Sequence, residues 1–162
     1  MIATRATRLV AAVALAMAAV APAFAAEWGS IVPGTSTTES VRASFGQPTR
    51  QTTQKVDGYD TTEWLYEGER APRGLQRLVV DFGLLTGAGY RANVVRTMRL
   101  EPVPGVFTRD TVLIGWGTPQ RAGKDGETPV FFYQDGLIVY FDKEGWVAAR
   151  LLFTPPQPAQ PQ

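Results

Sequence analysis

An internal repeat is the feature that most constrains the fold of this sequence. A segment of 16 residues that begins at Pro33 matches a second segment that begins 71 residues later, at Pro104. Six positions are identical, and an aromatic residue stands near the end of both segments. Composition alone gives about one identity in such a window, so the match indicates a duplicated supersecondary unit. We therefore predict two copies of one unit, at 31–102 and 103–154.

Each copy opens with the pattern of a short helix. Ser36 and Glu39 have the spacing of a capping box in the first copy, and Thr108 is a suitable N-cap in the second. A Gly-x-Pro sequence then ends both helices. Apolar pairs with i, i+4 spacing lie between the N-cap and the Gly-x-Pro sequence of each helix: Val41 with Phe45, and Val112 with Trp116. Helices this short are stable only when their apolar side packs against something else.

Strand patterns follow each helix. Leu78, Val80 and Phe82 alternate with other residues, which places the three side chains on one face of a strand. Turn dipeptides separate the strand-like runs, at Asp57-Gly58, Asp125-Gly126, Asp135-Gly136 and Glu144-Gly145. We expect an α+β fold of two tandem repeats, each a short helix packed on an antiparallel sheet of about four strands. A β-sandwich without helices is the alternative.

Residues 1–25 have the organisation of a secretory signal peptide. A positively charged start precedes an apolar run of 13 residues, which is too short to span a bilayer, and Ala23-Phe24-Ala25 has the small-x-small form of a cleavage site. We expect cleavage near Ala25 or Ala26 and a periplasmic or secreted mature protein. A retained N-terminal anchor is the alternative.

The expected mature chain is nearly neutral. Loss of Arg5 and Arg8 with the signal peptide leaves 14 basic against 15 acidic residues, without the basic patch of a nucleic-acid-binding protein. No cysteine follows the signal peptide, so we expect no lipid anchor. Residues 155–162 are rich in proline and glutamine and predict a disordered tail. We expect residues 26–32 to lie outside the core as well.

The sequence lacks both cysteine and histidine. Thiol nucleophiles, Ser-His catalysis, Cys/His zinc sites and iron–sulfur clusters are therefore excluded. Carboxylates gather in the first copy, but no EF-hand loop accompanies them: Asp57, Asp60, Glu63, Glu67 and Glu69. We predict a protein that is not an enzyme and binds neither metal nor cofactor. A small enzyme or metal binder that uses these carboxylates stays open as a further hypothesis.

Motifs of the second copy carry a resemblance to a known family. They are Gly105, Thr108, Val112 and Gly117-Thr118-Pro119, followed by Phe131-Phe132-Tyr133 and by Leu137, Val139 and Phe141. In this spacing the chain resembles the SmpA/OmlA (BamE-like) family, within the wider β-lactamase-inhibitor-protein-like superfamily. The family has a single unit and a lipidated cysteine, whereas this chain has two copies and no cysteine. The resemblance implies a non-enzymatic protein-binding module of the bacterial cell envelope, akin to outer-membrane assembly factors. The alternative is a secreted inhibitor-like protein that binds a hydrolase such as a β-lactamase.

The outer sheet face of the second copy is the predicted binding site. Where the first copy has Val79 and Asp81, the second has Ile138 and Tyr140. The full candidate set is Phe132, Ile138, Tyr140, Trp146 and Arg150. Aromatic side chains with an arginine are typical of protein-binding hot spots.

Two alternatives concern this face. Either the other copy covers it, or the strand parity is shifted by one residue. A basic stretch that includes Arg96 and Arg99 is the next candidate, for an acidic partner or for a peripheral contact with lipid headgroups.

Overall fold

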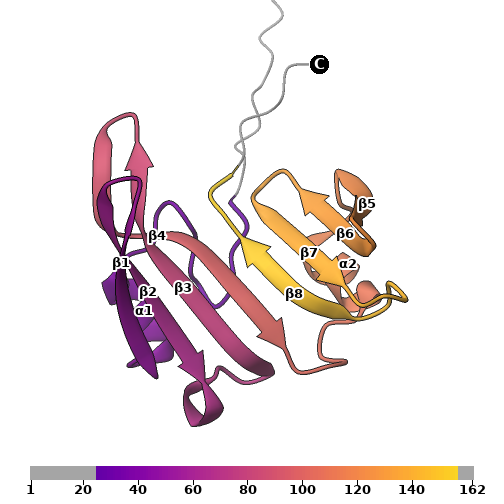
Figure 1. Ribbon diagram of the computed structural model, residues 1–162. Coiled ribbons are helices and arrows are strands. Elements are labelled where there is room, and N and C mark those ends of the chain that lie inside the picture. Colours follow the sequence, from indigo (N-terminus) through magenta and orange to yellow (C-terminus); the bar gives the residue numbers. More distant parts are fainter. Residues whose placement is uncertain (1–24, 157–162) are drawn as a thin grey trace, which may run out of the picture.

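Eight antiparallel strands form one sheet in the computed structural model, which describes residues 25–156 (Figure 1). Two short α-helices and one turn of 3-10 helix accompany them. In chain order the elements are α1 (Thr38–Phe45), β1 (Arg50–Val56), β2 (Tyr59–Glu67), η1 (Gly68–Arg70), β3 (Leu75–Thr86), β4 (Gly89–Pro102), α2 (Arg109–Trp116), β5 (Arg121–Asp125), β6 (Thr128–Tyr133), β7 (Leu137–Phe141) and β8 (Ala148–Phe153).

The prediction of two tandem repeats, each with a helix on its own sheet, is wrong. The strand order is β1-β2-β3-β4-β8-β7-β6-β5, so all strands belong to one sheet, and the fold is dominated by that sheet. Met98–Leu100 of β4 pairs with Leu151–Phe153 of β8 and joins the two halves. The physical reason is that an edge strand presents unpaired N–H and C=O groups, and pairing β4 with β8 removes two such edges.

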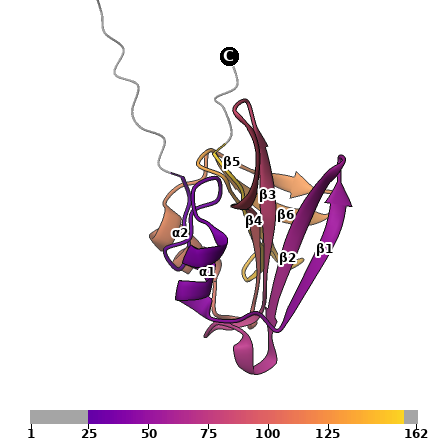
Figure 2. The same ribbon diagram turned by 90° about the vertical axis from the view of Figure 1, so that its left-hand side faces the viewer.

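Both α-helices lie on the same face of the sheet (Figure 2). Val41 of α1 and Val112 of α2 are fully buried, and Phe45 and Trp116 pack half-buried against the same core. The predicted docking of both apolar pairs is therefore confirmed. Burial of each valine contributes about 1.5–3 kcal/mol, which these helices of two turns need in order to form.

The first helix begins one residue later than the expected capping box. The Ser36 hydroxyl accepts a hydrogen bond from the Val32 nitrogen at 3.0 Å, which leaves Thr37 as the N-cap. The Thr37 nitrogen donates to the Ser40 hydroxyl at 3.4 Å, so the capping box of Ser36 and Glu39 is wrong. At α2 the Thr108 hydroxyl accepts from the Thr111 nitrogen at 3.2 Å, as expected.

Part of the segment 26–32 belongs to the core, against expectation. Ala26 and Ile31 are 3% and 0% exposed, and Trp28 stacks on Phe45 with 5.4 Å between ring centroids. The predicted signal peptide, 1–25, and the predicted disordered tail, 155–162, lie almost wholly in residues 1–24 and 157–162, outside the described part of the chain. Of the tail, Pro155 and Pro156 are described and are half-buried. No helix within residues 25–156 is long and apolar enough to cross a membrane.

Candidate protein-binding site

The face of the sheet opposite the helices, here called the open face, carries one line of side chains across all eight strands. Each residue in this line is the Cα partner of the next: Arg50, Leu65, Val79, Arg99, Leu152, Ile138, Phe132 and Arg121. Cross-strand partners point to the same side of a sheet. Arginine therefore stands at both ends and in the middle of an otherwise apolar line.

Four of the five predicted site residues meet on the open face. Phe132 of β6 is the partner of Ile138 of β7, and Tyr140 of β7 is the partner of Arg150 of β8. The first three side chains are half-buried and Arg150 is exposed.

Trp146 does not join them. It lies in the turn between β7 and β8 and is 66% exposed. Its carbonyl oxygen accepts a hydrogen bond of 2.8 Å from the Arg109 nitrogen at the start of α2. Trp146 is thus held at the end of the sheet next to α2, away from the line on the open face.

No element of residues 25–156 covers the open face of β5–β8 (Figures 1 and 2). The first half of the chain does not lie over the second, because β4 and β8 are neighbours in one sheet. The alternative in which the other copy buries this face is therefore wrong.

Arg77 differs from the other arginines of the open face in how its charge is paired. On the first half, Arg77 contacts the carboxylate of Glu67 at 3.3 Å and that of Glu101 at 3.5 Å. On the second half, Arg121 and Arg150 form no ion pair with another described residue, and neither does Arg99 of β4. The second half and its border therefore offer unpaired positive charge.

Two of these arginines lie over aromatic rings. The guanidinium carbon of Arg150 is 3.9 Å from the centroid of Tyr140, and that of Arg121 is 4.4 Å from the centroid of Phe132. A guanidinium stacked in this way keeps its N–H edge free for a carboxylate. We call the following set the arginine–aromatic patch: Phe132, Ile138, Tyr140, Leu152, Arg99, Arg121 and Arg150.

A hollow of about 450 Å³ borders the patch. Tyr140 and Arg150 line it together with Glu101 of β4 and Asp125 at the tip of the β5–β6 hairpin. The hollow therefore has carboxylates from two different strands near the stacked arginine, and it is large enough to take a side chain of a partner.

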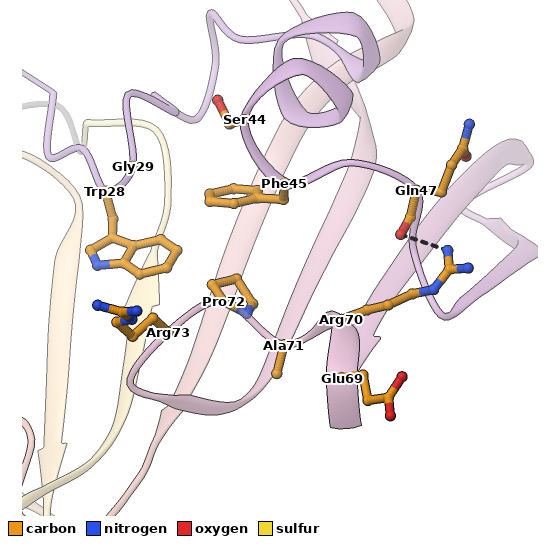
Figure 3. Close-up of a pocket in the computed structure, with 10 residues that line it drawn as sticks. All are labelled: Trp28, Gly29, Ser44, Phe45, Gln47, Glu69, Arg70, Ala71, Pro72 and Arg73. Carbon is orange, nitrogen blue, oxygen red and sulfur yellow. Dashed lines mark hydrogen bonds between the residues drawn. The ribbon is translucent and has the colours of Figure 1, made fainter.

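A second hollow, of about 640 Å³, lies between α1 and the connection from β2 to β3 (Figure 3). Trp28, Phe45 and Pro72 form its apolar side, and Arg70 fixes one wall by donating to the carbonyl oxygens of Gln47 at 3.1 Å and Pro48 at 3.2 Å. This hollow is not among the sites predicted from the sequence. The sequence feature that could have indicated it is a longer connection in the first half. Residues 68–74 join β2 to β3, whereas only residues 134–136 join β6 to β7 in the second half.

The carboxylates considered for catalysis or metal binding are not brought together. Asp60 pairs with Lys55 at 2.8 Å, and Glu67 pairs with Arg77. Within residues 25–156 no group of three or more carboxylates is placed to hold a metal ion.

Comparison with known proteins adds little. No protein-family model matches the sequence, and no curated protein matches it. A crystal structure of a DUF4309 family protein (YjgB) from Bacillus subtilis subsp. subtilis str. 168 is similar, with a TM-score of 0.47 and 16% sequence identity. The match covers 78% of this chain and 82% of the other. A likeness at this level carries no argument about function.

Proposed function

We propose that this protein is an exported, non-enzymatic binding module of the cell envelope that recognises an acidic protein surface through its arginine–aromatic patch. The observation that carries the proposal is the state of Arg121 and Arg150, each stacked on an aromatic ring and free of an ion-pair partner among the described residues. Arginine and tyrosine are over-represented among residues that dominate binding energy.

Prior ordering of the arginines supports this role. A free arginine loses rotamer freedom when it binds, at about 0.5–1.5 kcal/mol for each side chain that becomes fixed. Stacking on Tyr140 and Phe132 restricts Arg150 and Arg121 before the partner arrives. A carboxylate then meets a guanidinium that is already in place.

A protein fits the patch better than an anionic membrane does. The open face also carries Glu67, Asp81 and Glu101, which a uniformly negative lipid surface would repel. The hollow between Glu101 and Asp125 suits a basic or polar side chain beside the acidic ones. Such mixed charge favours a partner whose own charges are patterned to match.

Membership of the SmpA/OmlA family, export to the periplasm and a role near outer-membrane assembly are parts of the same proposal. They rest on the sequence motifs and on the signal-peptide pattern. The inhibitor-like alternative uses the same patch on a different partner, a soluble hydrolase.

Site-specific photo-crosslinking in the native host tests the proposal. A photoreactive phenylalanine analogue replaces Ile138 in the patch, and, in a control chain, Ile114 of α2, which is 85% exposed on the opposite side of the molecule. We expect a defined protein adduct from position 138 and none from position 114. The double substitution Arg121→Glu, Arg150→Glu is expected to abolish the adduct, whereas Arg91→Glu, a charge reversal at one arginine on the exposed β3–β4 hairpin, is expected to leave it.

The identity of the adduct separates the hypotheses. A component of the outer-membrane assembly machinery supports the family-like role, and a soluble hydrolase supports the inhibitor-like role. Adducts only with lipid, or a protein adduct that survives the double substitution, would contradict binding of an acidic protein by the patch.

A further inference from the structure

Ala26 is held unusually firmly for a residue at the start of the described chain. It is 3% exposed and belongs to the core. Its backbone nitrogen donates a hydrogen bond of 2.8 Å to the carbonyl oxygen of Asp135, in the turn between β6 and β7. The first residues of a domain are usually loose unless something ties them down.

The side chain of Asp135 has an oxygen without a partner. Its Oδ1 atom is buried from solvent and accepts no hydrogen bond from another described residue, and Asp135 forms no ion pair with one. Burial raises the pKa of this carboxyl above its ordinary value. A buried acceptor left unsatisfied is costly and rare in native proteins, so the fold contains a place for a further donor beside Asp135.

Hydrolysis of the peptide bond between Ala25 and Ala26 creates a donor at this place. Water adds to the carbonyl carbon of Ala25, the C–N bond breaks, and Ala25 departs with a carboxylate. The nitrogen of Ala26 becomes an ammonium group with three N–H donors and a positive charge. One donor can keep the bond to the Asp135 carbonyl oxygen, and the five covalent bonds that join this oxygen to Oδ1 of the same residue keep the two oxygens within about 6 Å of each other.

We propose that the mature chain begins at Ala26 and that its α-ammonium group is bound by the Asp135 carboxylate. Processing then converts an unsatisfied buried oxygen into half of a charge-assisted pair, a stronger interaction than a neutral hydrogen bond. The proposal does not depend on the binding partner of the patch.

Cleavage one residue later, between Ala26 and Glu27, would lose contacts that cleavage before Ala26 keeps. It removes Ala26, and with it both a buried side chain and the hydrogen bond to Asp135. The new terminus is then Glu27, which is exposed. The geometry therefore favours the Ala25–Ala26 bond over the next one.

The pair between the Ala26 ammonium group and the Asp135 carboxylate is tested in chains of two lengths, each with two alternative side chains at position 135. One chain begins at Ala26, and the other retains residues 21–25, which moves the ammonium away; each is made with Asp135 and with Asp135→Asn. Asparagine keeps the size of the side chain and removes its charge. In the chain that begins at Ala26, we expect Asp135→Asn to lower the folding equilibrium constant about tenfold in urea unfolding, since the pair is charge-assisted. In the longer chain we expect a change of twofold or less.

Equal effects of Asp135→Asn in both chains, or no effect in either, overturn the proposal. If the Asn variants do not fold, N-terminal acetylation of the wild-type chain that begins at Ala26 replaces them. It removes the positive charge and two of the three N–H donors, and unchanged stability then overturns the proposal. Mass spectrometry of the protein from its host adds an independent result: a first residue of Ala26 supports the proposal, and Glu27 or Met1 overturns it.

Discussion

Arg150 lies over the ring of Tyr140, with 3.9 Å between the guanidinium carbon and the ring centroid. The two residues are Cα partners on neighbouring strands, β8 and β7, so the backbone pairing itself sets the stack. The contact fixes a long, flexible cation on a face of the sheet that no described element covers. A fixed and unpaired charge of this kind is better suited to recognition than to the stability of the fold, to which an exposed cation–π contact contributes only about 0.5–1 kcal/mol.

Tyr140→Asp should separate binding from folding. The side chain is half-buried on the open face, and an aspartate there can pair with Arg150, so we expect the melting temperature to fall by only a few degrees. Binding to the crosslinked partner should weaken by about 2 kcal/mol or more, because the ring is lost and the arginine is neutralised. Thermal melts and titration of the purified partner measure the two effects. A variant that folds and binds normally would remove Tyr140 from the site.

Trp116→Ala tests the docking of α2 on the sheet. Trp116 is half-buried and packs on Phe107 and Phe153, with ring centroids 5.9 Å and 6.0 Å away. We expect the free energy of unfolding to fall by about 3 kcal/mol, at the lower end for a large-to-small core change because the ring is not fully enclosed. Ile114→Ala on the same helix is the control; it is 85% exposed and should change stability by less than about 0.5 kcal/mol. Similar losses for both variants in urea unfolding would contradict this packing.

Features set by neighbours along the chain could be predicted from the sequence. Gly46 and Gly117 end the two helices with φ of 75° and 77°, a conformation that glycine adopts readily, and Val41 and Val112 are buried as their spacing implies. The pairing of β4 with β8 could not be predicted in this way. It depends on backbone N–H and C=O groups, which every residue supplies, so side chains such as Met98 give no signal for it.

The placement of Trp146 failed for a local reason. Tyr140 pairs with Arg150, but Phe141 pairs with Ala148, so β8 holds one extra residue at a β-bulge. Counting by twos from Arg150 to Trp146 therefore crosses an irregular step, and parity no longer assigns a face. The other candidates, including Ile138, lie on the regularly paired side of this step and fall on the face that alternation predicts.

Buried tyrosines should make stability depend on high pH. Tyr66 donates its hydroxyl to the Gly46 carbonyl oxygen at 3.0 Å, and burial raises the pKa of Tyr66 to about 12. Unfolded tyrosine has a pKa of about 10, so the folded state holds the proton more tightly. This contribution is complete below pH 10 and is lost as the pH rises from about 10 to about 12.

Tyr66→Phe checks that assignment. At pH 8 we expect it to lower stability by about 1–2 kcal/mol, because the Gly46 carbonyl loses its donor. Between pH 10 and 12 the variant should lose less further stability than the wild type. Tyr133 has the equivalent bond, to the Gly117 carbonyl oxygen at 3.0 Å, and its pKa is also raised by burial, so Tyr66→Phe, Tyr133→Phe should flatten the profile further. An unchanged alkaline slope in urea-unfolding series would contradict the prediction.

Gly136→Ala should be among the most damaging turn substitutions in this fold. Gly136 follows Asp135 in the β6–β7 turn with φ of 104°, a conformation that side chains rarely adopt, and an added Cβ would collide with the backbone carbonyl oxygen of Thr154. A backbone atom cannot rotate aside as a side chain can. The same turn accepts the hydrogen bond from the Ala26 nitrogen, so a displaced Gly136 also disturbs the packing of the N-terminal segment. We expect a loss of at least about 2 kcal/mol in urea unfolding.

Gly123→Ala in β5 is the matched control, because its Cβ would meet nothing within 4 Å and its φ is not positive; it should change stability by about 0.5 kcal/mol or less. Equal stability of the two variants would show that the turn relaxes without strain.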